Sequence, residues 1–300
     1  MGQKKMREYK APLRIDFAGS WTDIPHLIKN KTGYVSTATI TPHFEYSNKK
    51  LFTNGYARGI GLCTSTAVEA IELIKSNNEK FQFKTLEEIA EILFRSENKT
   101  LDWAIGRQDA YSITFGGFNC FQFKQDGATP LDIQVPKETL DQLEENLILF
   151  YSGIQRNSQK VTKEIYENFN SKESKYTEAI NKLAKYGLDF AINLEKGNLD
   201  YCGQILSSNW EVQKQLAKST SNKELNEIYD FAIKNNAIGG KLCGAGSGGC
   251  FIFYTQDKEE LENKLSNQFP KGKVIDFKFE YKNIKKLNEE NKENENSNIP

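Results

Sequence analysis

Residues 239–250 read GGKLCGAGSGGC, which places six glycines in twelve positions, and the apolar segment FIFY (251–254) follows directly. Each glycine inside a helix or strand costs roughly 0.5–1 kcal/mol, so such a run indicates backbone in unusual conformations or backbone pressed against a partner. The run therefore predicts a loop that approaches a ligand or another loop, followed by a buried strand.

A second loop of small residues, GIGLCTSTA, lies at residues 59–67 and leads into a helical apolar pattern at 68–74. Glycines offer bare backbone N–H groups, hydroxyls suit a metal ion, and the start of a helix carries a partial positive charge. This combination favours phosphate binding, and two such loops in one chain point to an enzyme that handles a nucleotide phosphate. A plain N-cap, which threonine and serine also favour, is the alternative for 64–66.

The composition bounds the class of protein. Three hundred residues suit one large domain or two ordinary ones, and 38% apolar residues are enough for a core. Forty basic residues balance forty acidic ones, which gives no electrostatic reason to expect nucleic acid or an anionic membrane as a partner. Five scattered cysteines predict reduced thiols in a cytoplasmic protein, and two histidines leave little for a histidine metal site or a Ser-His-Asp triad.

The periodicity of the apolar residues predicts a mixed α+β chain. Strands are expected at 8–18, 33–46 (or a hairpin), 118–123, 147–151, 250–255 and 273–281. Helices are expected at 64–77, 85–97, 104–115 and 258–268, with two or three long amphipathic helices between 151 and 239. A polar stretch at 124–146 suggests the boundary, giving domains at 1–145 and 146–286 and a disordered tail at 287–300.

Four segments together resemble the GHMP kinase family, which is named for galactokinase, homoserine kinase, mevalonate kinase and phosphomevalonate kinase. They are APLRIDFAGSWTD (11–23), GLCTSTA (61–67), GRQDAY (106–111) with FGG behind it, and KLCGAGSGG (241–249). They occur in the family's order and span most of the chain. Within the family, the chain most resembles the sugar kinases of the D-glycero-D-manno-heptose 7-phosphate kinase group and the bacterial fucokinase-like enzymes.

This resemblance implies a ribosomal-S5-like N-terminal domain, a ferredoxin-like C-terminal domain, and an active site in the cleft between them. It implies ATP as phosphoryl donor and Mg²⁺ as metal, with Ser65 and Glu97 as magnesium ligands. The ATP phosphates would lie against Gly61, Leu62, Cys63, Thr64, Ser65 and Thr66. A solvated glutamate at the end of a helix is the alternative for Glu97.

The resemblance also implies that Asp109 is the general base for the acceptor hydroxyl and that Arg14 lies beside it and the γ-phosphate. A fixed positive charge there would keep Asp109 ionised and offset developing charge. The alternatives are that Asp109 caps the helix that begins near it and that Arg14 is a surface residue of a strand.

The acceptor is implied to lie against Ser20, Trp21, Thr22 and Asp23, because a carboxylate suits a pair of neighbouring hydroxyls. Gly244, Gly246 and Gly248 would let the second glycine loop approach the first and contact substrate. Tyr151 and Arg156 are weaker candidates for a distal substrate phosphate. The alternatives are a turn before Pro25 for Asp23, a core position for Trp21, and a tight turn between strands for the glycines.

Two features depart from the family pattern. Cys63 stands where the family usually has glycine, which limits the backbone at that point. The interval 44–58 is also much shorter than the family's, in which this region helps to bind adenine, and the proline before the loop is absent.

The expected function is an ATP-dependent sugar kinase that acts on a hexose or heptose, with D-glycero-D-manno-heptose 7-phosphate first. A fucose- or galactose-type sugar 1-kinase, a homoserine- or mevalonate-type kinase, and a non-catalytic ATP- and sugar-binding regulator remain as alternatives. The expected partner is a small-molecule sugar or sugar phosphate, with no nucleic acid and no membrane, and a homodimer is compatible with the sequence.

Overall fold

The first half of the molecule is built on an antiparallel sheet. The computed structural model describes residues 8–47, 50–53, 55, 59–81, 83–100, 105–155 and 158–289. The sheet runs in the order β1 (Tyr9–Ala18), β2 (Gly33–Ser47), β4 (Phe118–Phe123) and β5 (Ala128–Pro130), and β3 (Lys50–Phe52) pairs with β2. Residues 33–47 form one long strand, not a hairpin.

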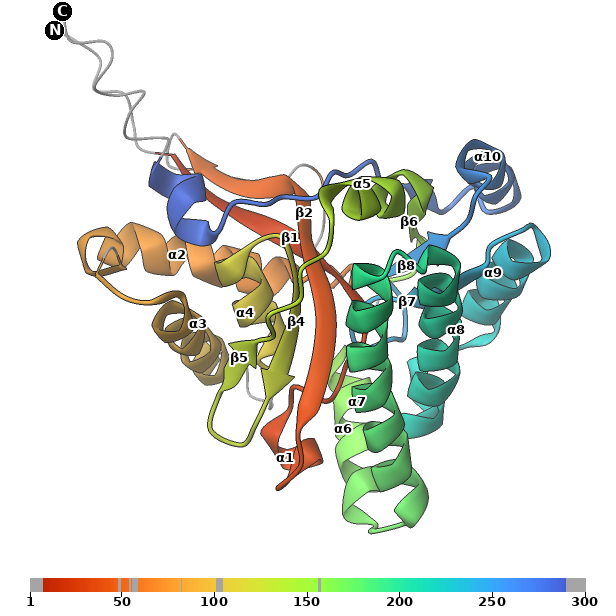
Figure 1. Ribbon diagram of the computed structural model, residues 1–300, viewed down its shortest axis with the longest axis horizontal. Coiled ribbons are helices and arrows are strands. Elements are labelled where there is room, and N and C mark those ends of the chain that lie inside the picture. The colour runs from red at the N-terminus through yellow and green to blue at the C-terminus, as the bar shows by residue number, and fades with distance from the viewer. Residues whose placement is uncertain are drawn as a thin grey trace, which may run out of the picture.

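Helices cover this sheet (Figure 1). The short helix α1 (Pro25–Ile28) follows β1, and α2 (Thr64–Phe81) and α4 (Gln108–Phe115) pack against β1 and β2. Helix α3 (Leu86–Thr100) packs against both α2 and α4. The expected helix at 104–115 thus begins at Gln108, directly after Arg107.

The second half is built on a sheet in the order β7 (Gly239–Leu242), β8 (Cys250–Tyr254), β6 (Leu147–Tyr151) and β9 (Lys273–Val274). Strand β6 is buried on both faces because alternate residues point in opposite directions. Leu147 and Leu149 join the core shared with the first sheet, whereas Ile148 and Phe150 join a separate core. The remaining elements of this half are α5 (Lys137–Asn146), α6 (Ser158–Asn170), α7 (Ser174–Glu195), α8 (Leu199–Leu216), the short 3₁₀ helix at Lys218–Thr220, α9 (Lys223–Lys234) and α10 (Lys258–Gln268).

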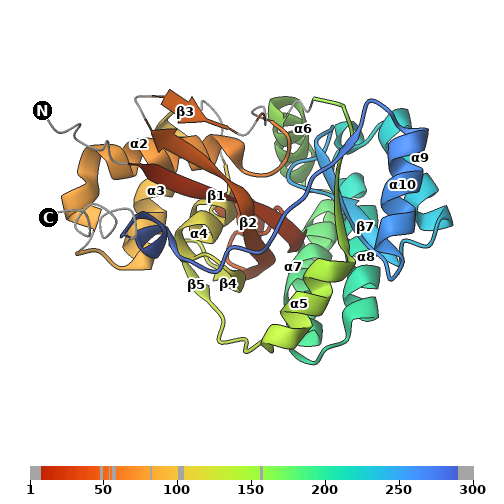
Figure 2. The same cartoon turned by 90° about the horizontal axis from the view of Figure 1, so that it is seen from above.

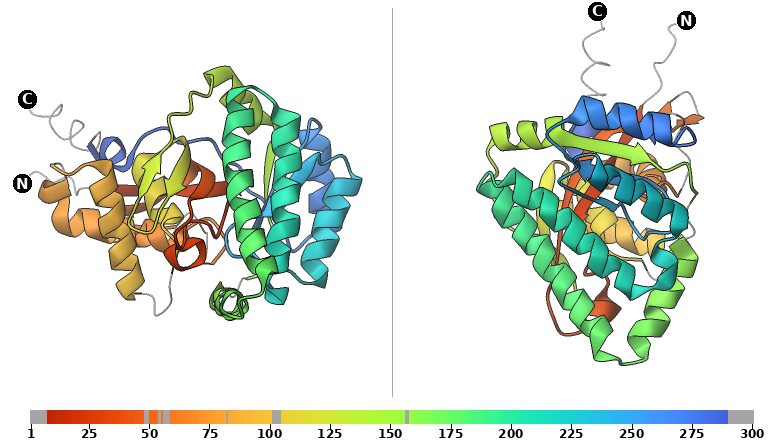
Figure 3. Two further views of the ribbon diagram at one scale, coloured as in Figure 1. Left: turned by 60° about the horizontal axis from the view of Figure 1, so that its bottom comes forward. Right: turned by 90° about the vertical axis from the view of Figure 1, so that its right-hand side faces the viewer.

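Two long helices connect the halves. Helices α7 and α8 lie side by side, as both views of Figure 3 show, with α7 against the first sheet and α8 against β7 and β8. The contact with β2 is close: a Cβ added to Gly187 of α7 would lie 2.0 Å from the carbonyl oxygen of Tyr34. Glycine is therefore required at position 187 for α7 to reach the sheet.

The chain after β9 returns to the first sheet as a strap, residues 275–289, whose last residues, 284–289, are helical (Figure 2). The expected strand at 273–281 is wrong beyond Val274, because Glu280 N–H donates to Thr39 O and Phe279 forms only an isolated bridge with Ile40. Residues 284–289 are helical and Leu287 is buried, so regular structure runs past residue 287, the expected start of the tail; residues 290–300 lie outside the described part.

The α+β class expected from the sequence is confirmed by these two sheets with their helices. The ranges expected for β4, β6 and α10 agree with the structure. Within the described ranges, no helix is long and apolar enough to cross a membrane.

Candidate active site

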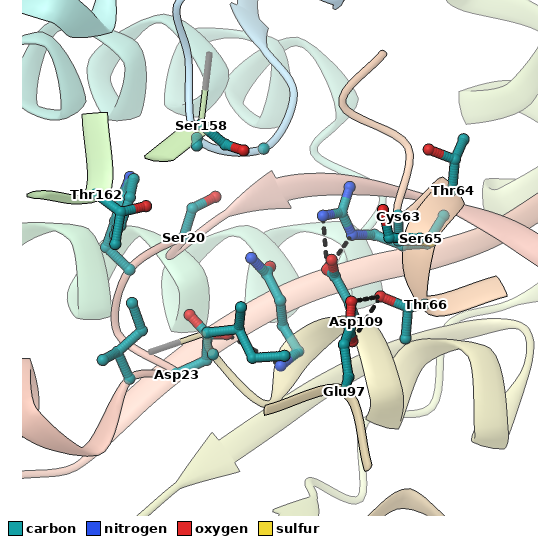
Figure 4. A pocket seen from close by; sticks show the side chains of 18 residues that line it. Ser20, Asp23, Cys63, Thr64, Ser65, Thr66, Glu97, Asp109, Ser158 and Thr162 are labelled. Carbon is teal, nitrogen blue, oxygen red and sulfur yellow. Dashed lines mark hydrogen bonds and ion pairs between the residues drawn. The ribbon is translucent and has the colours of Figure 1, made fainter. Parts of the chain in front are cut away.

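A pocket lies where the two sheets and their loops meet (Figure 4). The first half contributes the turn after β1, the loop before α2 with the first residues of that helix, the end of α3 and the start of α4. The second half contributes α6 and the glycine loop after β7. The polar and aromatic side chains that line this pocket are those of Arg14, Ser20, Trp21, Asp23, Cys63, Thr64, Ser65, Thr66, Glu97, Gln108, Asp109, Ser158 and Thr162.

The two glycine-rich loops pack against each other beside the pocket. Cys250 N–H donates to Ile60 O at 2.8 Å, and a Cβ added to Gly61 would lie 2.7 Å from Cys243 O. Of the glycines expected at the substrate, Gly244 lines the pocket together with Ala245. Gly246 and Gly248 do not line it; a Cβ on Gly246 would meet Thr220 O at 2.6 Å. The tight packing of the loop, not contact with substrate, accounts for the glycine at 246.

Arg14 on β1 holds Asp109 on α4 by two hydrogen bonds. Its Nε and Nη2 donate to Asp109 Oδ1 at 2.8 and 2.6 Å, and its Nη1 donates to Gly61 O at 2.7 Å. Arg14 is 1% exposed, so it is not a surface arginine. Burial opposes its charge, but Asp109 and then Asp16 raise the pKa of Arg14 above its ordinary value, which keeps it positive.

Asp109 lies in the first turn of α4, whose N-cap is Arg107 and carries no side-chain capping bond. The aspartate therefore does not cap this helix. Its carboxylate instead faces the pocket between the loop before α2 and the turn after β1 (Figure 4). A carboxylate in that place can accept a proton from a hydroxyl bound beside it.

The start of α2 brings three hydroxyls to the pocket. Thr64 and Thr66 are buried and Ser65 is half-buried. The hydroxyl of Thr66 donates to both carboxylate oxygens of Glu97, at 2.9 Å each, so it is not directed at a ligand. Gly61 and Leu62 do not line the pocket, and the Leu62 side chain is fully buried in the core. Only the Cys63–Thr66 part of the expected phosphate loop faces the cavity.

Cys63 has φ of 53°, a left-handed conformation that suits glycine better than any residue with a side chain. The thiol is buried, and burial raises its pKa well above the ordinary value. The sequence expectation that a side chain here constrains the loop agrees with this geometry.

Glu97 is a buried carboxylate, 6% exposed, and not a solvated helix end. Burial, with a smaller contribution from the negative charge of Asp109, raises the pKa of Glu97 to about 8. Within the described part of the chain its only hydrogen bonds come from the Thr66 hydroxyl. A cation beside it would remove this imbalance.

These residues fit Mg²⁺, which usually takes one or two carboxylates and keeps water and substrate phosphates for its other positions. Glu97 supplies a carboxylate that forms no ion pair with any residue the structure describes, and the Ser65 hydroxyl lines the same pocket. No group of three or more histidine, cysteine, aspartate or glutamate side chains that could hold a metal occurs among the residues described.

The other end of the pocket is formed by the turn after β1 (Figure 4). Asp23 is 2% exposed, and burial, partly offset by a hydrogen bond from Gln108 N–H at 3.0 Å, raises the pKa of Asp23 to about 6. Ser20 and Trp21 line the pocket beside it, and the buried indole Nε1 of Trp21 has no hydrogen-bond partner among the residues that the structure describes. This end offers a carboxylate, a hydroxyl and an indole N–H.

Thr22 does not belong to the pocket. Its hydroxyl is bonded to the carbonyl oxygens of Gly19 and Tyr34, at 2.7 and 3.0 Å, and holds the turn against β2. The expectation that Thr22 contacts substrate is therefore wrong, because turn geometry uses its hydroxyl. Tyr151 lies on β6 and does not line the pocket, and Arg156 lies outside the described residues.

The sequence reading assigned no role to Asp16 and Lys241. Lys241 Nζ on β7 donates to Asp16 Oδ2 on β1 at 2.6 Å, and both side chains are fully buried. Arg14 and Asp16 are two apart on a strand and therefore share a face. The sequence signal that could have pointed to Asp16 is this pair of opposite charges on one face of an otherwise apolar strand. Ser158 and Thr162, one helical turn apart on α6, were also missed.

Comparison with known proteins agrees with this fold. The family model described as GHMP kinases C terminal matches residues 190–271. The chain is 26% identical over 334 residues to D-glycero-alpha-D-manno-heptose 7-phosphate kinase from Campylobacter jejuni, covering 92% of this chain and 97% of the relative. It is also 26% identical over 157 residues to L-fucokinase/L-fucose-1-P guanylyltransferase from Bacteroides fragilis, 51% of this chain but 16% of that protein.

Among solved structures, a D-glycero-D-manno-heptose 1-phosphate kinase from Bacteroides thetaiotaomicron has a TM-score of 0.68 at 22% identity, over 92% of this chain and 97% of that one. That likeness shows a shared fold across almost the whole chain. The fold, the two glycine loops and these matches together define a GHMP-type kinase architecture. The chain is thus similar to GHMP kinases, through the family model over residues 190–271 and through a shared fold over almost its whole length.

Proposed function

We propose that this protein is an ATP-dependent sugar kinase that transfers the γ-phosphoryl group of ATP to a hydroxyl of a hexose or heptose. The observation that carries the proposal is the position of Asp109, held by Arg14 between the start of α2 and the acceptor end of the pocket. Phosphoryl transfer depends on positioning, charge neutralisation and a proton acceptor, and this site offers groups for each.

The residues divide into two sets. The Cys63–Thr66 segment at the N-terminus of α2 binds the ATP phosphates, and Ser65 and Glu97 hold Mg²⁺. When bound, Mg²⁺ supplies neutralisation of the phosphate charge. Asp23, Ser20 and Trp21 hold the acceptor, Asp109 takes the proton from its reacting hydroxyl, and Arg14 holds Asp109 in place by two hydrogen bonds.

We take D-glycero-D-manno-heptose 7-phosphate as the first acceptor. Support comes from the full-length relative in Campylobacter jejuni, whose name states that activity. A non-catalytic regulator is disfavoured because Asp109, Glu97 and Arg14, the residues that transfer would need, all line one pocket.

A fucose- or galactose-type sugar 1-kinase is the second candidate. The partial match to L-fucokinase favours it, and so does the charge of the pocket, since Arg14 is the only cation that lines it within the described part of the chain. A neutral sugar needs no further cation, whereas a sugar phosphate does.

The test is ATP consumption with Mg²⁺ against heptose 7-phosphate, fucose, galactose, mannose, homoserine and mevalonate. Turnover with one sugar supports the proposal and identifies the acceptor. Turnover with homoserine or mevalonate alone contradicts the sugar assignment. Silence across the panel, with ATP binding intact by calorimetry, favours the non-catalytic regulator.

A further inference from the structure

The carboxylate of Asp16 is a buried junction between the two halves of the molecule. It is fully buried and accepts hydrogen bonds from Lys241 Nζ at 2.6 Å, from Gly244 N–H at 2.8 Å and from the Ser20 hydroxyl. Arg14 Nη1 lies 3.4 Å from Asp16 Oδ1. Ser20 and Gly244 both line the pocket, so one carboxylate fixes two pocket walls.

Four charged side chains form this cluster, the cations Arg14 and Lys241 and the anions Asp16 and Asp109. Lys241 is fully buried, and among the described residues its ammonium group bonds only to Asp16, with the second bond to Asp16 O at 3.0 Å. Burial raises the pKa of Asp16, but the charges of Lys241 and then Arg14 outweigh burial and lower this pKa below its ordinary value. The carboxylate is therefore ionised and needs a positive partner.

The distances show how the two cations are divided. Arg14 makes its short contacts, at 2.6 and 2.8 Å, with Asp109, and only a long one, at 3.4 Å, with Asp16. Lys241 takes the short contact with Asp16. Asp16 would otherwise be a buried anion competing for Arg14, and uncompensated buried charges are strongly unfavourable.

We propose that Lys241 is a positioning residue, which by neutralising Asp16 leaves Arg14 to hold Asp109 at the reacting hydroxyl. This inference rests on the proposed function. Lys241 touches neither substrate nor reacting atoms, because it does not line the pocket. It acts through Asp16 and Arg14, so its loss affects the chemical step more than binding.

The experiment compares Lys241→Met, Asp16→Asn and the double variant Asp16→Asn/Lys241→Met. In Lys241→Met the unpaired Asp16 draws Arg14 away from Asp109, and we expect kcat to fall roughly tenfold or more while the acceptor KM and the Kd of ATP change less than about threefold. The double variant removes both charges, so Asp16 no longer attracts Arg14. Arg14 can then hold Asp109 again, and kcat should be higher than in Lys241→Met. Rescue by a second loss is not expected of a residue with a merely structural role, because independent losses add.

Lys10→Met is the matched control. Lys10 lies on the same strand β1, its Nζ is 3.3 Å from Glu45 Oε1, and neither residue lines the pocket. It should leave kcat unchanged. Wild-type kcat in Lys241→Met, or a double variant no better than Lys241→Met, overturns the inference. If Lys241→Met does not fold, the neutral double variant decides: a loss beyond about tenfold in kcat overturns the inference. Absence of turnover in the wild type contradicts the proposed function instead.

Discussion

The hydroxyl of Thr66 on helix α2 lies 2.9 Å from each carboxylate oxygen of Glu97 on helix α3. In the pocket, this hydroxyl is the donor that connects the two helices. One hydroxyl proton cannot satisfy a buried carboxylate that also faces the negative charge of Asp109. The ligand-free protein is therefore strained electrostatically at the position where the proposed function places a cation. This relationship makes stability and activity respond in opposite ways to the same substitution.

Glu97→Gln should stabilise the ligand-free protein at alkaline pH and abolish Mg²⁺-dependent transfer. The folded protein raises the pKa of Glu97 from 4.5 to about 8, so the folded state holds the proton more tightly than the unfolded state. The stabilisation present below pH 4.5 is lost as the pH rises through 8. At pH 8–9 the amide should be more stable by about 1 kcal/mol or more.

Thermal unfolding from pH 5 to 9 without divalent cations measures this difference. Glu178→Gln on α7 is the control, because that side chain is exposed and away from the pocket. Equal pH dependence in wild type and Glu97→Gln would show that Glu97 is not a source of alkaline destabilisation.

Gly106→Ala should impair acceptor binding and spare ATP binding. A Cβ at position 106 would lie 1.7 Å from Asp23 Oδ2, so Asp23 must move from its place at the start of α4. We expect the acceptor KM to rise about tenfold or more, with the Kd of ATP within a few-fold. Gly127→Ala is the matched control, since nothing lies within 4 Å of its added Cβ. A normal acceptor KM in Gly106→Ala would remove Asp23 from the acceptor site.

Acceptor binding should weaken in mild acid because burial raises the pKa of Asp23 to about 6. Protonation below that pH removes the carboxylate that accepts hydrogen bonds from sugar hydroxyls. The acceptor KM measured between pH 5 and 8 should therefore rise as the pH falls through 6. In Asp23→Asn the KM should be high at every pH and lose this dependence; a dependence that persists in that variant would assign it to another group.

Cys63→Gly should be more stable than Cys63→Ala. Both remove the thiol, but at φ of 53° alanine keeps a Cβ in a left-handed conformation, which glycine adopts freely. The difference should be about 1 kcal/mol in the free energy of urea unfolding. Equal stabilities, or a more stable alanine variant, would mean that the loop before α2 is not strained at this residue.

Asp109→Asn should lower kcat by about 10² to 10⁴ and leave the Kd of ATP nearly unchanged. The amide can still accept hydrogen bonds from Arg14 but cannot take the proton of the acceptor hydroxyl. Single-turnover kinetics with calorimetric ATP binding separates the two effects. A kcat within threefold of wild type would rule out Asp109 as the base.

The sequence predicted the parts of this fold that depend on local pattern. The strand at 118–123 and the helix at 258–268 follow from periodicity, and the approach of the glycine loops follows from the bare backbone at Gly61 and Gly249. Thr22 was misassigned because a hydroxyl in a turn suits a ligand as well as the carbonyl oxygen that it bonds here.

The contacts that join the two halves were not predictable in the same way. The pairing of Lys241 with Asp16 spans 225 positions and depends on how the two sheets meet. The strap was expected as a strand because its alternating residues fit one, yet it crosses to the first sheet instead, where Glu280 bonds with Thr39. Local patterns do not encode which sheet a segment joins.

The strap also brings the two ends of the described chain, residues 8 and 289, close together. Lys10 N–H donates to Asn288 Oδ1 at 2.9 Å, and Asn288 Nδ2 donates to Lys10 O at 3.0 Å. A short peptide joining residue 289 to residue 8 would close the polypeptide into a ring without moving either segment. Reopening that ring at the turn around Gly127, where an added Cβ would meet no atom within 4 Å, gives a circular permutant in which the second half precedes the first during synthesis.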